Sequence, residues 1–238
     1  MAMQKPARPS ARAQAKAETR EALIDAALAE FAAHGLDAPS LDAICARAGF
    51  TRGALYVHFR DRDELVVAVM DRAFGAFLDA IIPTGAGPQD LERTVRRYAD
   101  ATAGLAALRA RRGRAGAPLA DAVPLHRILE ACNRSPALRA RFVALLGEAA
   151  ERVARTAAAG QQGGTIRGDV PATAIGPLLV TLALGFLAAI DAGATVDAAV
   201  GRDVVLELLA PLSDESPQQV PAIEGQEGSE RPEEPRSS

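Results

Sequence analysis

Residues 19–65 contain three helical patterns in close succession, and this spacing constrains the fold more than any other feature of the chain. The first pattern, TREALIDAALAEFAAHG, repeats apolar residues at helical intervals and ends at Gly35. The second, SLDAICARAG, begins after Ser40, a favourable N-cap, and ends at Gly49. The third begins at once after Thr51, another N-cap residue. Two short helices joined by a tight turn and packed against a third predict a helix-turn-helix unit.

The third helix, in the segment TRGALYVHFRDRDEL, has two different sides. At about 100° per residue, Leu55 and Phe59 share one stripe that can pack on the first two helices. His58 falls at the edge of that stripe. The opposite arc combines a cation, a bare backbone, a phenol and a small apolar side chain, which suits the major groove of DNA: Arg52, Gly53, Tyr56 and Val57.

A fourth helix is predicted from Asp61 to about Ile82. Asp61 is a good N-cap, and Glu64 three residues later predicts a capping box. Apolar residues then continue at helical spacing until the segment PTGAGP at residues 83–88 ends the helix.

The rest of the chain is also predicted to be helical, because it lacks any useful length of strand-like alternation. Ser135 followed by Pro136 indicates the start of a long helix. Gly176-Pro177 predicts a kink, because proline removes a backbone donor. The fold is therefore expected to be all-α, with shorter helices within about 119–133 and further helices at about 89–108, 136–160, 171–192 and 195–212.

The ends of the chain carry opposite charges, although the formal net charge is only −3. Residues 1–20 contain five basic residues and a single acid, Glu18, whereas residues 213–238 contain seven acids and two arginines. We predict a flexible basic arm at 1–16 and a disordered acidic tail at 213–238. The helix-turn-helix domain is expected at 17–66 and a second helical domain at 67–212.

The N-terminal pattern resembles the DNA-binding domain of the TetR/AcrR family of bacterial transcriptional repressors, over residues 19 to about 70. The resemblance implies that Ser40, Thr51, Tyr56 and His58 contact phosphates. It also implies that Arg62, at the start of the fourth helix, grips the DNA backbone. The positions expected to face bases are Arg52, Gly53 and Val57, although Val57 is smaller than the residue common there.

Structural interpretations of the same residues stay open. Ser40 and Thr51 are helix caps whether or not they contact DNA. His58 can equally be a packing histidine. Arg52 and Tyr56 have the alternative of being solvated surface side chains. The basic arm can serve solubility alone.

The C-terminal half resembles the ligand-binding and dimerisation domain of the same family, which implies a four-helix bundle formed by the last two helices of two subunits. Small residues at 183, 185, 188 and 189 support close helix approach. Val196, Val200, Val204 and Leu208 recur at four-residue spacing. Candidate residues lining an effector pocket, with core packing as the alternative, are Tyr98, His126, Leu129 and Phe142.

Other chemistry is weakly indicated. Residues 172–190 are uncharged and long enough to cross a bilayer, but their glycine, proline and alanine content favours a buried interface helix. Cys45 and Cys132 suit a reducing cytosol and give no disulfide framework. His126 and Cys132 do not share a helix face, so no metal site is expected. The chain has no phosphate-binding glycine loop, GxSxG or HExxH motif, and no signal peptide is expected.

The sequence therefore predicts a cytoplasmic, homodimeric, TetR-like regulator without a cofactor, metal, membrane span or enzymatic activity. Its partners would be double-stranded operator DNA and a small-molecule effector of unknown identity. Repression relieved by that effector is the favoured mode, and an activator or ligand-independent regulator with the same DNA head is the alternative. A helical small-molecule-binding enzyme with a vestigial head is a further alternative.

Overall fold

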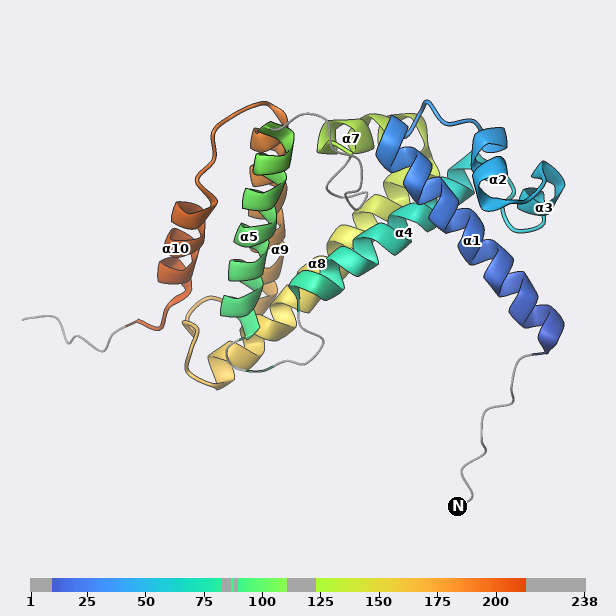
Figure 1. The fold of residues 1–238 in the computed structure, drawn as a ribbon. Coiled ribbons are helices and arrows are strands. Elements are labelled where there is room, and N and C mark those ends of the chain that lie inside the picture. The colour runs from blue at the N-terminus through green and yellow to red at the C-terminus, as the bar shows by residue number, and fades with distance from the viewer. Residues whose placement is uncertain (1–9, 83–86, 88–89, 111–122, 213–238) are drawn as a thin grey trace, which may run out of the picture.

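The computed structural model describes residues 10–82, 87, 90–110 and 123–212, and the regular structure in these ranges is helical throughout. Figure 1 shows α1, α2 and α3 at one end of the molecule and α10 at the other, with α4 and α8 running diagonally between them. The helices are α1 (Ala11–His34), α2 (Leu41–Ala48), α3 (Arg52–Tyr56), α4 (Arg62–Ile81), α5 (Asp90–Ala110), α7 (Leu125–Arg134), α8 (Pro136–Gln162), α9 (Ala172–Asp191) and α10 (Ala198–Leu209).

Helix α1 begins earlier than the sequence pattern predicts. It starts at Ala11 rather than near Thr19, and the Ser10 hydroxyl oxygen accepts a hydrogen bond from the Ala13 N–H at 3.3 Å. The prediction that residues 1–16 form an irregular arm is therefore wrong for residues 11–16, while residues 1–9 lie outside the described part of the chain. Alanine, arginine, glutamine and lysine favour a helix without any apolar face, so periodicity could not reveal this segment.

The head formed by α1, α2 and α3 has a dense apolar core. Leu23, Phe31, Ile44, Leu55 and Phe59 are all essentially inaccessible to solvent. The predicted caps set the helix ends: the Ser40 and Thr51 hydroxyl oxygens each accept a backbone N–H three residues later. Gly49 ends α2 in the left-handed region at φ 74°, a conformation that strongly favours glycine.

Helix α4 leads from the head into the body. The Asp61 carboxylate accepts the Glu64 N–H at 2.9 Å, as predicted. The second half of the capping box differs, because the Glu64 carboxylate accepts the Arg60 N–H at 2.7 Å instead of the Asp61 N–H. The Arg60 guanidinium also contacts that carboxylate at 3.1 Å, which favours this arrangement.

Ion pairs join α4 to helices on both of its sides. Arg72 binds Asp25 on α1 at 2.9 Å, while the neighbouring Asp71 binds Arg141 on α8. Below these pairs one apolar cluster continues from Leu23 in the head to Phe142 in the body. The head and body therefore share a core, with α4 as their common element.

The body depends on two close helix crossings at glycines. A Cβ atom on Gly176 of α9 would lie 2.2 Å from the Ala150 carbonyl oxygen of α8, a distance that backbone cannot accommodate. A Cβ atom on Gly201 of α10 would lie 2.6 Å from the Phe186 ring of α9. These contacts bring α8, α9 and α10 together, and Figure 1 shows α9 and α10 beside α5 at the end opposite the head.

Predicted boundaries in the C-terminal half can be compared with the described helices. Ser135 caps α8 with Pro136 in its first turn, as predicted. Helix α7 begins at Leu125, after Pro124 in the N-cap position, within the range 119–133 that was predicted to contain short helices. Residues 111–122 and the predicted tail at 213–238 lie outside the described ranges.

Helix α9 is the one described helix that is long and apolar enough to cross a membrane by length and composition. Only a small part of it is buried within a single chain. Its exposed side carries Leu178, Thr181, Leu182 and Gly185, and the exposed side of α10 carries Val200, Val204 and Leu208. This end of the chain therefore exposes large apolar side chains on two neighbouring helices.

Candidate nucleic-acid interface and internal cavity

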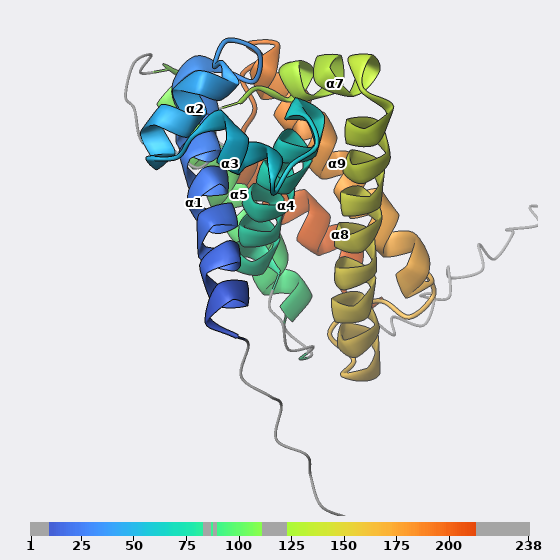
Figure 2. The ribbon, with the colours of Figure 1, turned by 90° about the vertical axis from the view of Figure 1, so that its right-hand side faces the viewer.

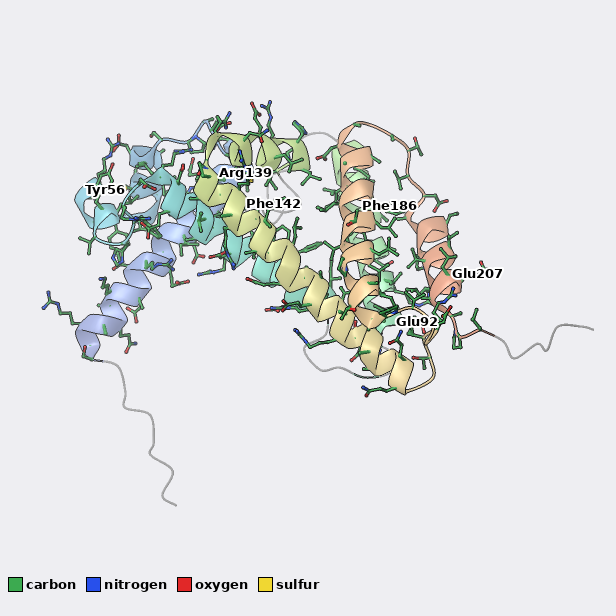
Figure 3. All side chains as sticks on the ribbon, turned by 180° about the vertical axis from the view of Figure 1, so that it is seen from behind. Tyr56, Glu92, Arg139, Phe142, Phe186 and Glu207 are labelled. Atoms are coloured by element: carbon green, nitrogen blue, oxygen red, sulfur yellow. The ribbon has the colours of Figure 1, made fainter. Side chains whose placement is uncertain are left out.

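Helix α3 is fixed on one side and open on the other. Leu55 and Phe59 bury it against α1 and α2, and the backbone N–H of His58 and of Phe59 both donate to the Leu55 carbonyl. On the open side Tyr56 is 50% exposed and Val57 is 65% exposed. Figure 3 shows Tyr56 at the outer end of the head. The predicted exposed arc of Arg52, Gly53, Tyr56 and Val57 is therefore present on the surface.

Arg52 is held by a neighbour rather than fully free. Its guanidinium lies 3.4 Å from an Asp42 carboxylate oxygen in the first turn of α2, and both side chains are exposed. An exposed pair of this kind contributes little stability. It keeps the arginine beside the turn, from which the side chain can rotate onto a base edge or a phosphate at small cost.

The hydroxyls of Ser40 and Thr51 can serve two purposes at once. Each oxygen accepts a backbone N–H, at 3.1 Å from Ala43 and 3.2 Å from Ala54. The hydroxyl proton takes no part in capping, and both side chains are exposed. The capping interpretation therefore does not compete with a phosphate contact, because the acceptor and donor functions of one hydroxyl are separate.

Gly53 has no structural requirement for glycine within the head. A Cβ atom there would meet only the Thr51 hydroxyl oxygen at 3.7 Å, an ordinary contact. Its backbone conformation is also open to other residues, since it is absent from the positive-φ glycines of the described chain. The absence of a side chain is thus consistent with close approach by a partner outside the protein.

His58 lies between α3 and the N-terminal half of α1. It is half-buried, and its ring lies 6.4 Å from the Phe59 ring. Burial lowers the pKa of His58, and the positive charges of Lys16 and Arg20 lower it further. Lys16 and Arg20 were not predicted as site residues, although their four-residue spacing in the sequence places them on one face of a helix.

Arg62 is committed to internal contacts. Its guanidinium donates to the carbonyl oxygens of Pro39 at 2.6 Å and Leu36 at 2.5 Å. It also lies 5.5 Å from the centre of the Phe31 ring. These bonds fix the segment between α1 and α2 that leads into Ser40, so in this structure Arg62 positions the head rather than presenting a free cation.

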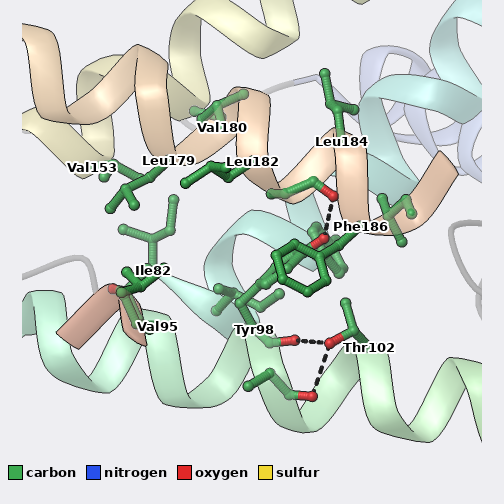
Figure 4. A pocket seen from close by; sticks show the side chains of 18 of the residues that line it. Ile82, Val95, Tyr98, Thr102, Val153, Leu179, Val180, Leu182, Leu184 and Phe186 are labelled. Carbon is green, nitrogen blue, oxygen red and sulfur yellow. Dashed lines mark hydrogen bonds between the residues drawn. The ribbon is translucent and has the colours of Figure 1, made fainter. Parts of the chain in front are cut away.

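An apolar cavity lies in the body between α4, α5, α8, α9 and α10. Its volume is about 950 Å³ when the space on its open side is included. Figure 4 shows Tyr98 and Thr102 of α5 and Phe186 of α9 reaching into it. The Tyr98 hydroxyl donates to the Ala183 carbonyl at 2.5 Å, and burial raises the pKa of Tyr98.

A second cavity of about 890 Å³, also partly open, adjoins the first on the side of the head. Phe74 and Phe77 line both cavities, so the two form adjacent chambers around a shared aromatic wall. Phe142 lines the second chamber and meets Phe74 edge-on, with ring centres 6.2 Å apart.

The predicted effector residues divide between these chambers and the surface. Tyr98 lines the first cavity and Phe142 lines the second. Leu129 and His126 line neither one: both lie on exposed positions of α7, and His126 Nδ1 is 3.8 Å from a carboxylate oxygen of Asp191. The shared phenylalanines, Phe74 and Phe77, were missed, because core and cavity residues have the same helical spacing.

Neither cysteine has the environment of a reactive thiol. Cys45 and Cys132 are both buried, and burial raises the pKa of each thiol, which disfavours the thiolate. Among the described residues, no group of three or more histidine, cysteine, aspartate or glutamate side chains could hold a metal ion.

Comparisons with known sequences agree on the N-terminal domain. The family model for bacterial regulatory proteins of the tetR family matches residues 23–69. An uncharacterised HTH-type transcriptional regulator, TtgW of Pseudomonas putida, is 50% identical over 58 residues, 24% of this chain and 42% of the relative. The repressor SCO4008 of Streptomyces coelicolor is 30% identical over 82 residues, 34% of this chain and 41% of the relative. The matched segments thus cover less than half of these curated relatives.

Solved structures extend the likeness to the whole fold. The SmeT–triclosan complex has a TM-score of 0.61 at 22% identity, covering 91% of this chain and all of the other. Reduced NemR of Escherichia coli has a TM-score of 0.64 at 17% identity, covering 82% and 99%. Helices α1, α2 and α3 form a helix-turn-helix domain, in which α3 is buried on one side and exposes polar side chains on the other. This domain is joined to a helical body. Residues 23–69 therefore match the DNA-binding domain of the tetR family of bacterial regulatory proteins, and the chain as a whole shares the fold of the solved structures.

Proposed function

We propose that this protein is a transcriptional regulator that binds a palindromic operator in double-stranded DNA as a homodimer in the cytoplasm. The observation that carries the proposal is the two-sided α3, in which buried Leu55 and Phe59 hold an exposed arc of Arg52, Gly53, Tyr56 and Val57. One such helix reads only a few base pairs, so a two-fold dimer is needed for useful specificity.

Support for the dimer comes from the opposite end of the molecule. The exposed apolar side chains of α9 and α10 form stripes that water would not favour, and a second copy can cover them symmetrically. The same covering would account for the hydrophobicity of α9 without placing it in a membrane. Gly185 and Ala188 lie among the exposed positions of α9, where small side chains permit close packing.

The paired chambers support control by a small molecule, with repression relieved by its binding. Polar groups in the first chamber are already bonded internally: Thr102 donates to backbone oxygens on its own helix, and Arg202 at the edge pairs with Asp203 at 2.7 Å. An effector would therefore be a largely apolar, uncharged compound in contact with Tyr98, Phe186 and the aromatic wall shared with the Phe142 chamber. It would release DNA only if it bound the non-binding conformation more tightly.

The proposal is tested by fluorescence anisotropy with DNA from upstream of the protein's own gene and a scrambled duplex of equal length. We expect the wild type to prefer the upstream fragment, and Arg52→Ala and Tyr56→Ala each to weaken that binding at least about tenfold. Arg155→Ala, which removes an exposed arginine from α8, is the matched control and should bind normally. Equal binding by all four proteins would overturn the assignment of α3 as the reading helix.

A further inference from the structure

The N-terminal half of α1 projects beyond the packed head and carries a basic face. Arg12, Lys16 and Arg20 follow one another at four-residue intervals, so they lie within about 80° of the helix circumference and about 6 Å apart along its axis. All three are exposed. Figure 2 shows α1 running past α2 and α3 toward the N-terminus.

Contacts at the inner end of this face locate it beside the reading helix. The Arg20 guanidinium lies 5.2 Å from the centre of the Phe59 ring, just after the end of α3. His58, the neighbouring residue, experiences the positive charges of both Lys16 and Arg20. The basic face is therefore continuous with the edge of the exposed arc of α3.

Acidic side chains do not neutralise the outer part of this face. Glu18 is the one acid between Ala11 and Arg20, and it lies on the other side of α1, where its carboxylate accepts a hydrogen bond from Gln14 at 3.1 Å. Within the described ranges Arg12 and Lys16 have no ion pair, whereas Arg20 lies 3.6 Å from Glu21. Two cations are thus available to a partner.

We propose that Arg12, Lys16 and Arg20 form a second DNA-contact surface, which binds the phosphate backbone beside the groove entered by α3. The inference rests on the proposed function, since it requires DNA at α3. A row of cations that follows a rigid helix matches a chain of phosphates, and the continuity with α3 means that a duplex seated there passes along it. The contact is sequence-independent, so it raises affinity for all DNA and leaves the preference for an operator unchanged.

The decisive variants are Arg12→Gln/Lys16→Gln and the charge-relocating Gln14→Lys/Lys16→Gln. The second keeps the net charge and moves one cation about 160° around the helix, where Glu18 can pair with it. Both use good helix formers, and circular dichroism verifies that α1 is retained. Arg20 is left intact because it also packs on Phe59.

Binding is measured with full-length protein on a random duplex of about 30 bp, over a series of salt concentrations. The slope of log affinity against log salt is negative, and loss of two phosphate contacts should make it shallower by about 1.8 per protomer. Relocation of one cation should make it shallower by about 0.9. The control Arg97→Gln/Arg155→Gln removes the same charge from exposed positions on α5 and α8 and should keep the wild-type slope.

A relocation variant that binds like the wild type would overturn the proposal, because net charge alone would then explain the binding. The proposal would also be overturned if the Arg12→Gln/Lys16→Gln variant changed the salt slope no more than the control variant does. Failure of the proposed function looks different: the wild type would treat the upstream fragment and its scramble alike, while the salt slopes on random DNA would still report on α1. A wild type that binds no DNA would overturn both.

Discussion

The two ends of this molecule are similarly exposed and have opposite chemical character. At the head, the exposed N-cap residues of α2 and α3 carry hydroxyls, and α3 itself exposes an arginine and a tyrosine. At the far end, exposed positions on α9 and α10 carry leucine and valine. Exposure by itself therefore identifies no function. A polar face held rigid by buried residues suits a hydrated, charged partner, whereas an apolar face needs a partner of its own kind.

The largest effect should come from placing a charge on the apolar end. Val204 on α10 is 48% exposed in the single chain, and Val204→Glu would bury a carboxylate in the proposed dimer interface. Because a two-fold interface contains each substitution twice, we expect dimer association to weaken at least about a hundredfold, with loss of operator binding. Sedimentation velocity measures the association.

The matched control for that experiment is Val143→Glu on α8. Val143 is 61% exposed and lies outside α9 and α10, so its replacement should leave the dimer intact. If both variants dissociate, or neither does, the apolar faces of α9 and α10 are not the interface, and the contrast between the two ends loses its functional meaning.

The head was more accessible to prediction than the body, for a physical reason. Its helix ends are set by local chemistry: Ser40, Thr51 and Asp61 cap helices through hydrogen bonds within three residues, and Gly49 turns the chain. Such bonds depend on neighbouring residues in the sequence. The start of α1 was missed because an alanine-rich segment can form a helix without an apolar face. The sequence of such a segment shows no apolar periodicity.

The cavity depends on contacts between distant segments, so its lining could be predicted only in part. Tyr98 and Phe142 reach the chambers, while His126 and Leu129 lie outside on α7. Helical spacing identifies an apolar side but not which neighbour it faces. Arg62 shows the same limit in the head, since its bonds to the carbonyls of Leu36 and Pro39 link residues far apart in the sequence.

A second prediction sharpens the polar end by separating capping from phosphate contact at Ser40. Asparagine and aspartate both cap helices well. The free energies of unfolding of Ser40→Asn and Ser40→Asp should therefore lie within about 0.5 kcal/mol of the wild-type value. The added carboxylate would repel a phosphate, and we expect Ser40→Asp to bind operator DNA at least about tenfold more weakly than Ser40→Asn. Equal affinities in anisotropy titrations would leave Ser40 as a cap alone.

A third prediction concerns Gly53, where stability and binding should change in opposite directions. Space exists for a Cβ atom, so Gly53→Ala should leave the free energy of unfolding unchanged or raise it by up to about 1 kcal/mol. The methyl group would hold DNA away from the backbone, and we expect a several-fold loss of operator affinity. Gly104→Ala, at an exposed and unobstructed position on α5, is the control that should gain helix stability without losing affinity. Tighter binding by Gly53→Ala would rule out close approach there.

The smallest effect, a pH dependence, decides between packing and phosphate contact at His58. In the free protein, burial and the charges of Lys16 and Arg20 lower the pKa of His58 below its usual 6.5, which favours the neutral ring. A phosphate beside the ring would raise that pKa in the complex, and DNA binding would then take up a proton. Affinity should therefore increase several-fold as the pH falls from about 7.5 toward the lowered pKa of the free protein.

Anisotropy titrations across that range, compared with His58→Gln, measure this proton linkage. His58→Gln should lose the pH dependence. The control His126→Gln should keep it, because that histidine lies on α7, outside the exposed arc of α3. If wild type and His58→Gln share the same pH profile, His58 packs against Phe59 without meeting a phosphate. The polar face of the head would then end at Tyr56 and Val57, and the basic face of α1 would have to reach DNA across a neutral gap.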